Sequence, residues 1–210
     1  MNLKTFYVQT LGLGLLKEDT NSFTVAVGIT KLTFIRADEQ TEKPFYHFAL
    51  NINENKFKLA KAYLSERITL LKDGSEDEFE FTDWNAHAVY FYDPAGNIVE
   101  FIARHNIKSN RISSNEFTTD DILSVSEVGL PVPDVASVVP LLQEDMNLPL
   151  WRGDLSTFQP VGDEQGLFII VAIDRVWLPT SDKASIFPVT VKIKDNVKKY
   201  KFPNLPYNIM

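Results

Sequence analysis

The sequence predicts an α+β fold in which one pattern recurs: a strand, then a helix, then several further strands. The pattern is complete in residues 45–104, recurs in residues 123–178, and is present without its first strand in residues 2–36. Its period of roughly 60 residues is longer than that of most solenoid repeats, which favours a repeated structural module.

The first half of the chain supplies the clearest elements. Residues 2–11 place Phe6, Tyr7 and Leu11 on one helical stripe, and Gly12 follows where a helix would end. The segment DPAGN at 93–97 has strong turn chemistry and should join two strands as a hairpin. Strands are expected at 23–27, 31–35, 45–52, 67–71, 86–92 and 98–102, and a second helix at 54–64.

The second half follows a polar segment. Residues 106–121 are rich in Asn, Ser, Thr and Asp and are predicted to link a first half, 1–105, to a second half, 122–210. The tail beyond Asn204 shows no clear element. Further strands are expected at 123–132, 155–161, 166–173 and 189–193, and a helix at 135–144.

Composition excludes several classes of protein. The 210 residues are 44% hydrophobic and 23% charged, as in ordinary globular proteins, and carry a net charge of −7, which argues against general nucleic-acid binding. No apolar run is long enough to span a membrane, and the N-terminus lacks the apolar stretch of a signal peptide, so a cytoplasmic location is expected. There is no cysteine, and no glycine-rich loop indicates a nucleotide cofactor.

Few catalytic groups remain. The only histidines are His47, His87 and His105, and there is no G-x-S-x-G elbow to pair one of them with a serine nucleophile. Carboxylate chemistry, a mixed histidine and carboxylate metal site, and a binding protein without chemistry are the possibilities left open.

One motif carries a resemblance to a known family. The segment YFYDPAGNIVEF at 90–101 resembles the closing hairpin of the vicinal oxygen chelate superfamily, which includes glyoxalase I, bleomycin resistance proteins and extradiol dioxygenases. Two other segments resemble parts of the family's modules: Phe6-Tyr7 with LGL at 11–13, and YHFA at 46–49. Residues 123–178 resemble a third βαβββ module that is more divergent. The resemblance implies repeated βαβββ modules whose curved mixed sheets enclose a cleft.

The resemblance also implies metal ligands. Family ligands occupy the strand positions matched here by His47 and Glu100. If both side chains point into one curved sheet, they can bind one divalent ion, with iron, manganese, nickel or zinc as candidates. The alternative is a histidine buried under a sheet and a glutamate facing a polar cleft.

Other positions depart from the family pattern. The first module lacks its opening strand, and Lys31 stands where glyoxalases have a glutamate ligand, so Lys31 either pairs with Glu100 across the cleft or is solvated. His87 and Tyr90 could lie beside the ligands or in the cleft, His105 is expected at the surface, and no catalytic residue is identified.

Two functions therefore stay open. One is a metal-dependent lyase or dioxygenase acting on a small molecule with adjacent oxygens; the other is a non-catalytic protein that sequesters a small molecule in a degenerate site. A homodimer is a further possibility. Residues 187–193 form a strand signal without an evident partner. This strand would fill the vacancy in the first module, in its own chain or in a symmetry partner, or extend the sheet of the third module.

Overall fold

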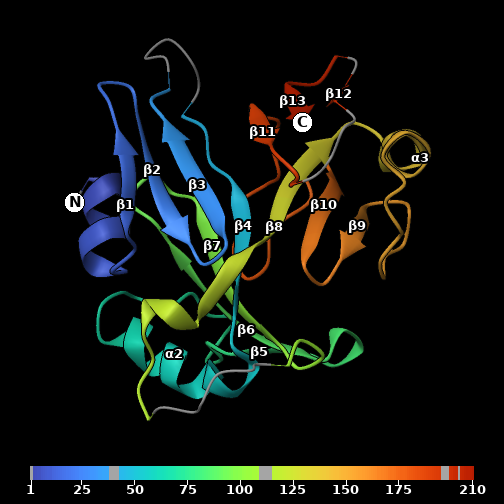
Figure 1. The fold of residues 1–210 in the computed structure, drawn as a ribbon. Helices are drawn as coiled ribbons and strands as arrows, with labels where there is room; N and C mark the ends of the chain where they lie inside the picture. The colour runs from blue at the N-terminus through green and yellow to red at the C-terminus, as the bar shows by residue number, and fades with distance from the viewer. Residues whose placement is uncertain (1, 38–42, 109–114, 195–198, 203) are drawn as a thin grey trace. The chain divides into compact units, whose positions relative to one another are not determined.

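The chain folds into two compact units, Met1–Ser126 and Glu127–Met210 (Figure 1). The computed structural model describes all residues except 1, 38–42, 109–114, 195–198 and 203. Both units combine helices with mixed or antiparallel sheets, which confirms the predicted α+β class.

The first unit begins with a helix packed on a three-stranded antiparallel sheet. Helix α1 (Leu3–Thr5) continues as the π-helix η1 (Phe6–Thr10), which confirms the predicted helix. The sheet has the order β1 (Leu15–Glu18), β2 (Ser22–Val27), β3 (Thr30–Ile35). Strand β1 was not predicted, because its four residues are all exposed and show no alternation.

The second part of this unit contains the predicted hairpin. Its strands have the order β5-β6-β7-β4, with β7 and β4 parallel and the other pairs antiparallel. The expected strand at 67–71 is wrong: Leu70 makes a single bridge to Phe91 there. The elements are β4 (His47–Ile52), η2 (Glu54–Lys56), α2 (Phe57–Ser65), β5 (Phe79–Phe81), η3 (Thr82–Trp84), β6 (Ala86–Tyr92) and β7 (Ile98–Arg104).

The described residues of the predicted linker, 106–108 and 115–121, belong to the first unit, while 109–114 lie outside the described residues. Phe117 is buried in its core, and Lys56 Nζ donates to the carbonyl of Glu116 at 2.8 Å. Helix η4 (Thr119–Asp121) follows, and Asn53 Nδ2 donates to the Asp121 carboxylate at 2.8 Å. Polar composition indicated a linker, and these contacts hold residues 116–121 of it against the first unit.

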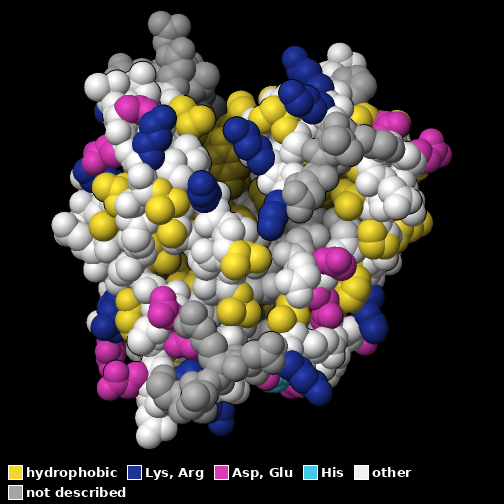
Figure 2. Space-filling model, viewed as in Figure 1, with side chains coloured by type: hydrophobic (Ala, Val, Ile, Leu, Met, Phe, Trp, Pro, Cys, Tyr) yellow, Lys and Arg dark blue, Asp and Glu magenta, His cyan; other side chains and the backbone are white. Residues whose placement is uncertain are grey.

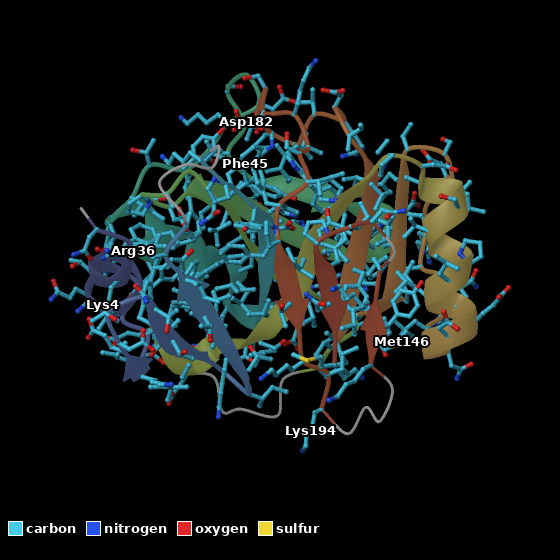
Figure 3. The ribbon with its side chains drawn as sticks, turned by 90° about the horizontal axis from the view of Figure 1, so that it is seen from above. Lys4, Arg36, Phe45, Met146, Asp182 and Lys194 are labelled. Carbon is cyan, nitrogen blue, oxygen red and sulfur yellow. The ribbon has the colours of Figure 1, made fainter. Side chains whose placement is uncertain are left out.

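Strand β8 (Ile122–Val132) crosses the boundary between the units. In the second unit β8 pairs in parallel with β10 (Gly166–Ala172), which pairs antiparallel with β9 (Phe158–Asp163). Helix α3 (Val135–Met146) packs its buried valines and Leu142 against these strands. Figure 3 shows the helix, with Met146 labelled at its end.

The C-terminal strands form their own small sheet. Strand β11 (Val189–Val191) pairs in parallel with β13 (Tyr207–Ile209), which pairs antiparallel with β12 (Tyr200–Lys201). Among the described residues, β11 therefore neither completes the first module nor extends the β8-β10-β9 sheet, and the tail beyond Asn204 does contain a strand.

The surface mixes charge and apolar groups. Figure 2 shows acidic, basic and hydrophobic side chains interspersed on the visible face. In the described part of the chain, every helix is too short or too polar to cross a membrane.

Candidate metal centre

Strands β4 and β7 bring His47 and Glu100 together. The parallel register pairs His47 with Ile98 and Ala49 with Glu100, so both functional side chains project from the same face of the sheet. His47 Nε2 lies 3.5 Å from Glu100 Oε2, and the two residues are only 6% and 3% exposed. The expected convergence of these side chains is therefore present.

The other ring nitrogen of His47 is held by the backbone. Its Nδ1 lies 3.3 Å from the carbonyl oxygen of Ile98, which can only accept a hydrogen bond. A proton on Nδ1 leaves the lone pair on Nε2, the nitrogen that faces Glu100. This arrangement orients a metal-binding imidazole in the usual way.

Glu127 adds a third donor. It directly follows Ser126, whose hydroxyl donates to the carbonyl of Ala49 on β4 at 3.5 Å. One ligand atom each of His47, Glu100 and Glu127 lies within 4.8 Å of the other two, and Glu127 is 5% exposed.

Sequence reasoning missed Glu127. The available signal was a single acidic residue in an otherwise apolar or small-residue strand, SVSEVGLPV. A buried carboxylate in such a strand requires a compensating partner, which makes it a candidate ligand. Nothing local in the sequence identifies that partner, because the other two donors come from strands far away along the chain.

Tyr90 borders the centre. It pairs directly with Glu100 across β6 and β7, so the two side chains share a face, and its ring centroid lies 6.3 Å from that of His47. The neighbouring positions on this face are the small residues Ala49 and Ala88. Tyr90 thus lies beside Glu100 on this face of the sheet, and its place in a functional cleft stays a prediction.

The remaining predicted residues lie elsewhere. Lys31 is exposed on β3, where it pairs with Ala26, so the structure does not bring it to Glu100. His87 pairs with Ala103, and this register puts it on the opposite face of the sheet from Tyr90. His105, expected at the surface, is half-buried and contacts His87.

The donor set fits a divalent ion. Two carboxylates buried close together repel each other, and either a proton or a cation must offset that repulsion. One imidazole nitrogen with two carboxylate groups suits manganese, iron, nickel or zinc. His47, Glu100 and Glu127 could therefore hold a metal ion.

Comparisons with known proteins agree with this architecture. No family model and no curated protein sequence matches the chain. A provisionally named dioxygenase from Bacillus subtilis subsp. subtilis str. 168 superposes with a TM-score of 0.58 and 19% identity, over 80% of this chain and 58% of that one. Two structures of glyoxalase I from Zea mays, one of a mutant, have TM-scores of 0.50 and identities of 17% and 16%.

The two maize structures match 80% and 87% of this chain, and 61% and 65% of their own. The chain thus spans about three fifths of the length of these three structures. The chain therefore has the fold of these glyoxalase I and dioxygenase structures, which agrees with the resemblance predicted from the sequence.

Proposed function

We propose that this protein is a divalent-metal-dependent enzyme that acts on a small molecule with adjacent oxygens, as a lyase or a dioxygenase. The observation that carries the proposal is the grouping of His47, Glu100 and Glu127, three buried donors within 4.8 Å of one another. The structures of similar fold are glyoxalase I and a provisionally named dioxygenase, which supports the choice of reaction class.

The three side chains would bind the ion and leave part of its coordination sphere for substrate oxygens. A bound divalent ion supplies Lewis-acid stabilisation of an oxyanion such as an enolate or catecholate. His47 contributes a neutral nitrogen because its Nδ1 proton is directed at the Ile98 carbonyl. The ligand set then carries two negative charges, which balance a divalent ion.

Protons would be handled by Glu100 and Tyr90. Each carboxylate has two oxygens, so one oxygen of Glu100 can bind the ion while the other accepts a proton from a substrate hydroxyl or carbon. The Tyr90 hydroxyl, on the neighbouring strand, can donate a hydrogen bond to a substrate oxygen. Both groups are buried, and exclusion of water strengthens such interactions.

The test measures metal content and turnover together. Protein loaded with iron(II), manganese, nickel or zinc should bind one equivalent at this centre, and catechols and hemithioacetals cover the two reaction classes. His47→Gln, Glu100→Gln and Glu127→Gln should each lower metal affinity by more than about tenfold and abolish turnover. Glu144→Gln, which removes the same charge from an exposed position on α3, should change neither the metal affinity nor the turnover.

Two results would contradict the proposal. Metal binding that is unchanged in all three variants would show that these side chains are not the ligands. Stoichiometric metal binding without turnover of any substrate would instead favour the sequestering protein that the sequence left open.

A further inference from the structure

Two histidines meet at the open end of the β6–β7 hairpin. The turn at 93–97 joins the strands at one end; at the other, His87 Nδ1 lies 2.8 Å from His105 Nε2. The backbone N–H of His105 donates to the carbonyl of Asn85 at 2.9 Å, and Asn85 Nδ2 donates to Asn106 Oδ1 at 2.7 Å. These bonds fix the backbone on both sides of the pair.

The histidine pair is separate from the candidate metal centre. On β6, His87 lies three residues before Tyr90, and successive strand residues alternate between faces. The side chain of His87 therefore projects away from the face of Tyr90 and Glu100, and its ring contacts Phe57 of α2 with centroids 5.4 Å apart. Neither histidine takes part in the proposed function.

The separation of the two nitrogens matches that of two ligands of one ion. Imidazole nitrogens bind zinc-sized ions at about 2.0–2.1 Å, so adjacent ligands at 90–110° lie about 2.9–3.3 Å apart. The observed 2.8 Å is a few tenths of an ångström shorter. A small opening of the pair would admit an ion in place of the proton that now joins the two rings.

A carboxylate stands next to the pair. Strand β5 pairs Glu80 directly with His87, so the two side chains share a face as cross-strand neighbours. Glu80 is exposed, and its flexible side chain can reach toward a bound ion. Both histidines are half-buried, which lets water fill the remaining coordination positions.

We propose that His87 and His105, assisted by Glu80, form a second metal site that binds a late first-row transition-metal ion: copper(II), nickel(II) or zinc(II). Imidazole favours these ions, whereas magnesium and calcium prefer sites made of oxygen ligands. The bound ion would close the hairpin at the end opposite its turn and so couple metal binding to the stability of β6 and β7.

The test uses the full chain carrying His47→Gln and Glu100→Gln, so that the first centre cannot contribute. Calorimetric titration with nickel(II) at pH 7.5 should give one equivalent, and copper(II) should give an electron paramagnetic resonance spectrum with two nitrogen ligands. Adding His87→Gln or His105→Gln should weaken nickel binding by more than about 100-fold. Glu80→Gln should weaken it by about tenfold or less and leave both nitrogens in the copper spectrum.

Stability measurements guard against misfolded variants. His87→Gln and His105→Gln should unfold close to the parent temperature without metal, and only the parent should gain thermal stability with nickel(II). Nickel binding that is retained in both histidine variants, or a copper spectrum without two nitrogens, would overturn the proposal.

Discussion

The hydroxyl of Tyr7 donates a 2.8 Å hydrogen bond to the carboxylate of Asp93, a buried contact between residues 86 positions apart. The same carboxylate accepts from the backbone N–H groups of Ala95 and Asn97 and from the side-chain amide of Asn97. Asp93 therefore makes local bonds within the 93–97 turn and also ties the N-terminal helix to the β6–β7 hairpin.

Removing this hydroxyl should weaken the first unit. Tyr7→Phe loses a bond to a charged acceptor in the core, so we expect the free energy of unfolding to fall by about 1.5–3 kcal/mol in urea titrations. Tyr63→Phe is the matched control, because its hydroxyl donates a longer, 3.3 Å bond to the neutral carbonyl of Leu11. A loss from Tyr7→Phe no larger than that from Tyr63→Phe would contradict the role assigned to Asp93.

The same pair should make stability depend on alkaline pH. Burial, and then the charge of Asp93, raise the pKa of Tyr7 well above its usual value of 10.0. Above about pH 10 the unfolded chain loses the phenolic proton while the folded protein keeps it, so the stability contributed by Tyr7 is complete below that pH and is lost as pH rises toward the folded pKa.

The expected slope is about 1.4 kcal/mol per pH unit above pH 10 for this group alone. The slope is measured from the free energies of unfolding of the wild type and Tyr7→Phe between pH 8 and 11. Taking the difference between the two proteins cancels the contributions of the other tyrosines and the lysines. Parallel curves for the two proteins would show that Tyr7 ionises as easily when folded as when unfolded.

The metal centre should cost stability when it holds no ion. Glu100 and Glu127 bring two carboxylates into a buried group within 4.8 Å, and a proton or a cation relieves the repulsion between them. With metal removed by a chelator at pH 8, Glu127→Gln should raise the free energy of unfolding by about 1 kcal/mol. With saturating manganese(II) the wild type should instead be the more stable of the two proteins, because only the wild type is stabilised by metal binding.

Glu144→Gln should leave stability unchanged under both conditions, since this side chain is exposed on α3. If Glu127→Gln destabilised the metal-free protein instead, the carboxylate would be a structural hydrogen-bonding group, and the case for a ligand would weaken.

Local sequence patterns predicted the elements that have strong periodicity. Strands β4, β6 and β7 and helix α2 follow from apolar spacing, whereas β5 and β13 are three residues long, too short to show a period. The candidate site likewise contains residues that a local pattern predicts and one that it does not. His47 and Glu100 follow from a motif, but Glu127 becomes recognisable only when the fold places β8 beside β4, information that no local window contains.

Gly28 is a position where backbone geometry excludes any side chain. Its φ is +52°, and a Cβ built there would lie 2.0 Å from the carbonyl oxygen of Leu123. The same carbonyl accepts from the backbone N–H of Ile29 at 2.9 Å, which attaches the β2–β3 turn to β8 within the first unit.

Gly28→Ala should therefore lower the free energy of unfolding by about 3 kcal/mol or more, since the backbone of Leu123 must move. Gly74→Ala separates this effect from backbone strain: Gly74 has a similar φ of +59° with nothing within 4 Å, so its cost should be only about 1 kcal/mol. Equal losses of unfolding free energy in the two variants, measured by urea unfolding, would show that the contact between Gly28 and the Leu123 carbonyl does not add to the cost.

The C-terminal strands should stabilise the second unit and leave the first unaffected. The sequence suggested that residues 187–193 fill a vacancy in the first module or extend the third module's sheet, but β11 pairs with β13. Phe202, Tyr207 and Ile209 are at most 2% exposed in the core of the second unit, and the Tyr207 hydroxyl donates to the carbonyl of Pro131 at 2.6 Å. Burial of each such side chain contributes about 1.5–3 kcal/mol.

Tyr207→Ala and deletion of residues 187–210 should therefore lower hydrogen-exchange protection in β10 and α3, the deletion more strongly. Protection in β2 and β7 should remain as in the intact chain, because these strands belong to the first core. Exchange is measured by mass spectrometry on peptides covering 22–27, 98–104, 135–146 and 166–172. A loss of protection at 22–27 in the deletion variant would show that the C-terminal strands support the first unit after all.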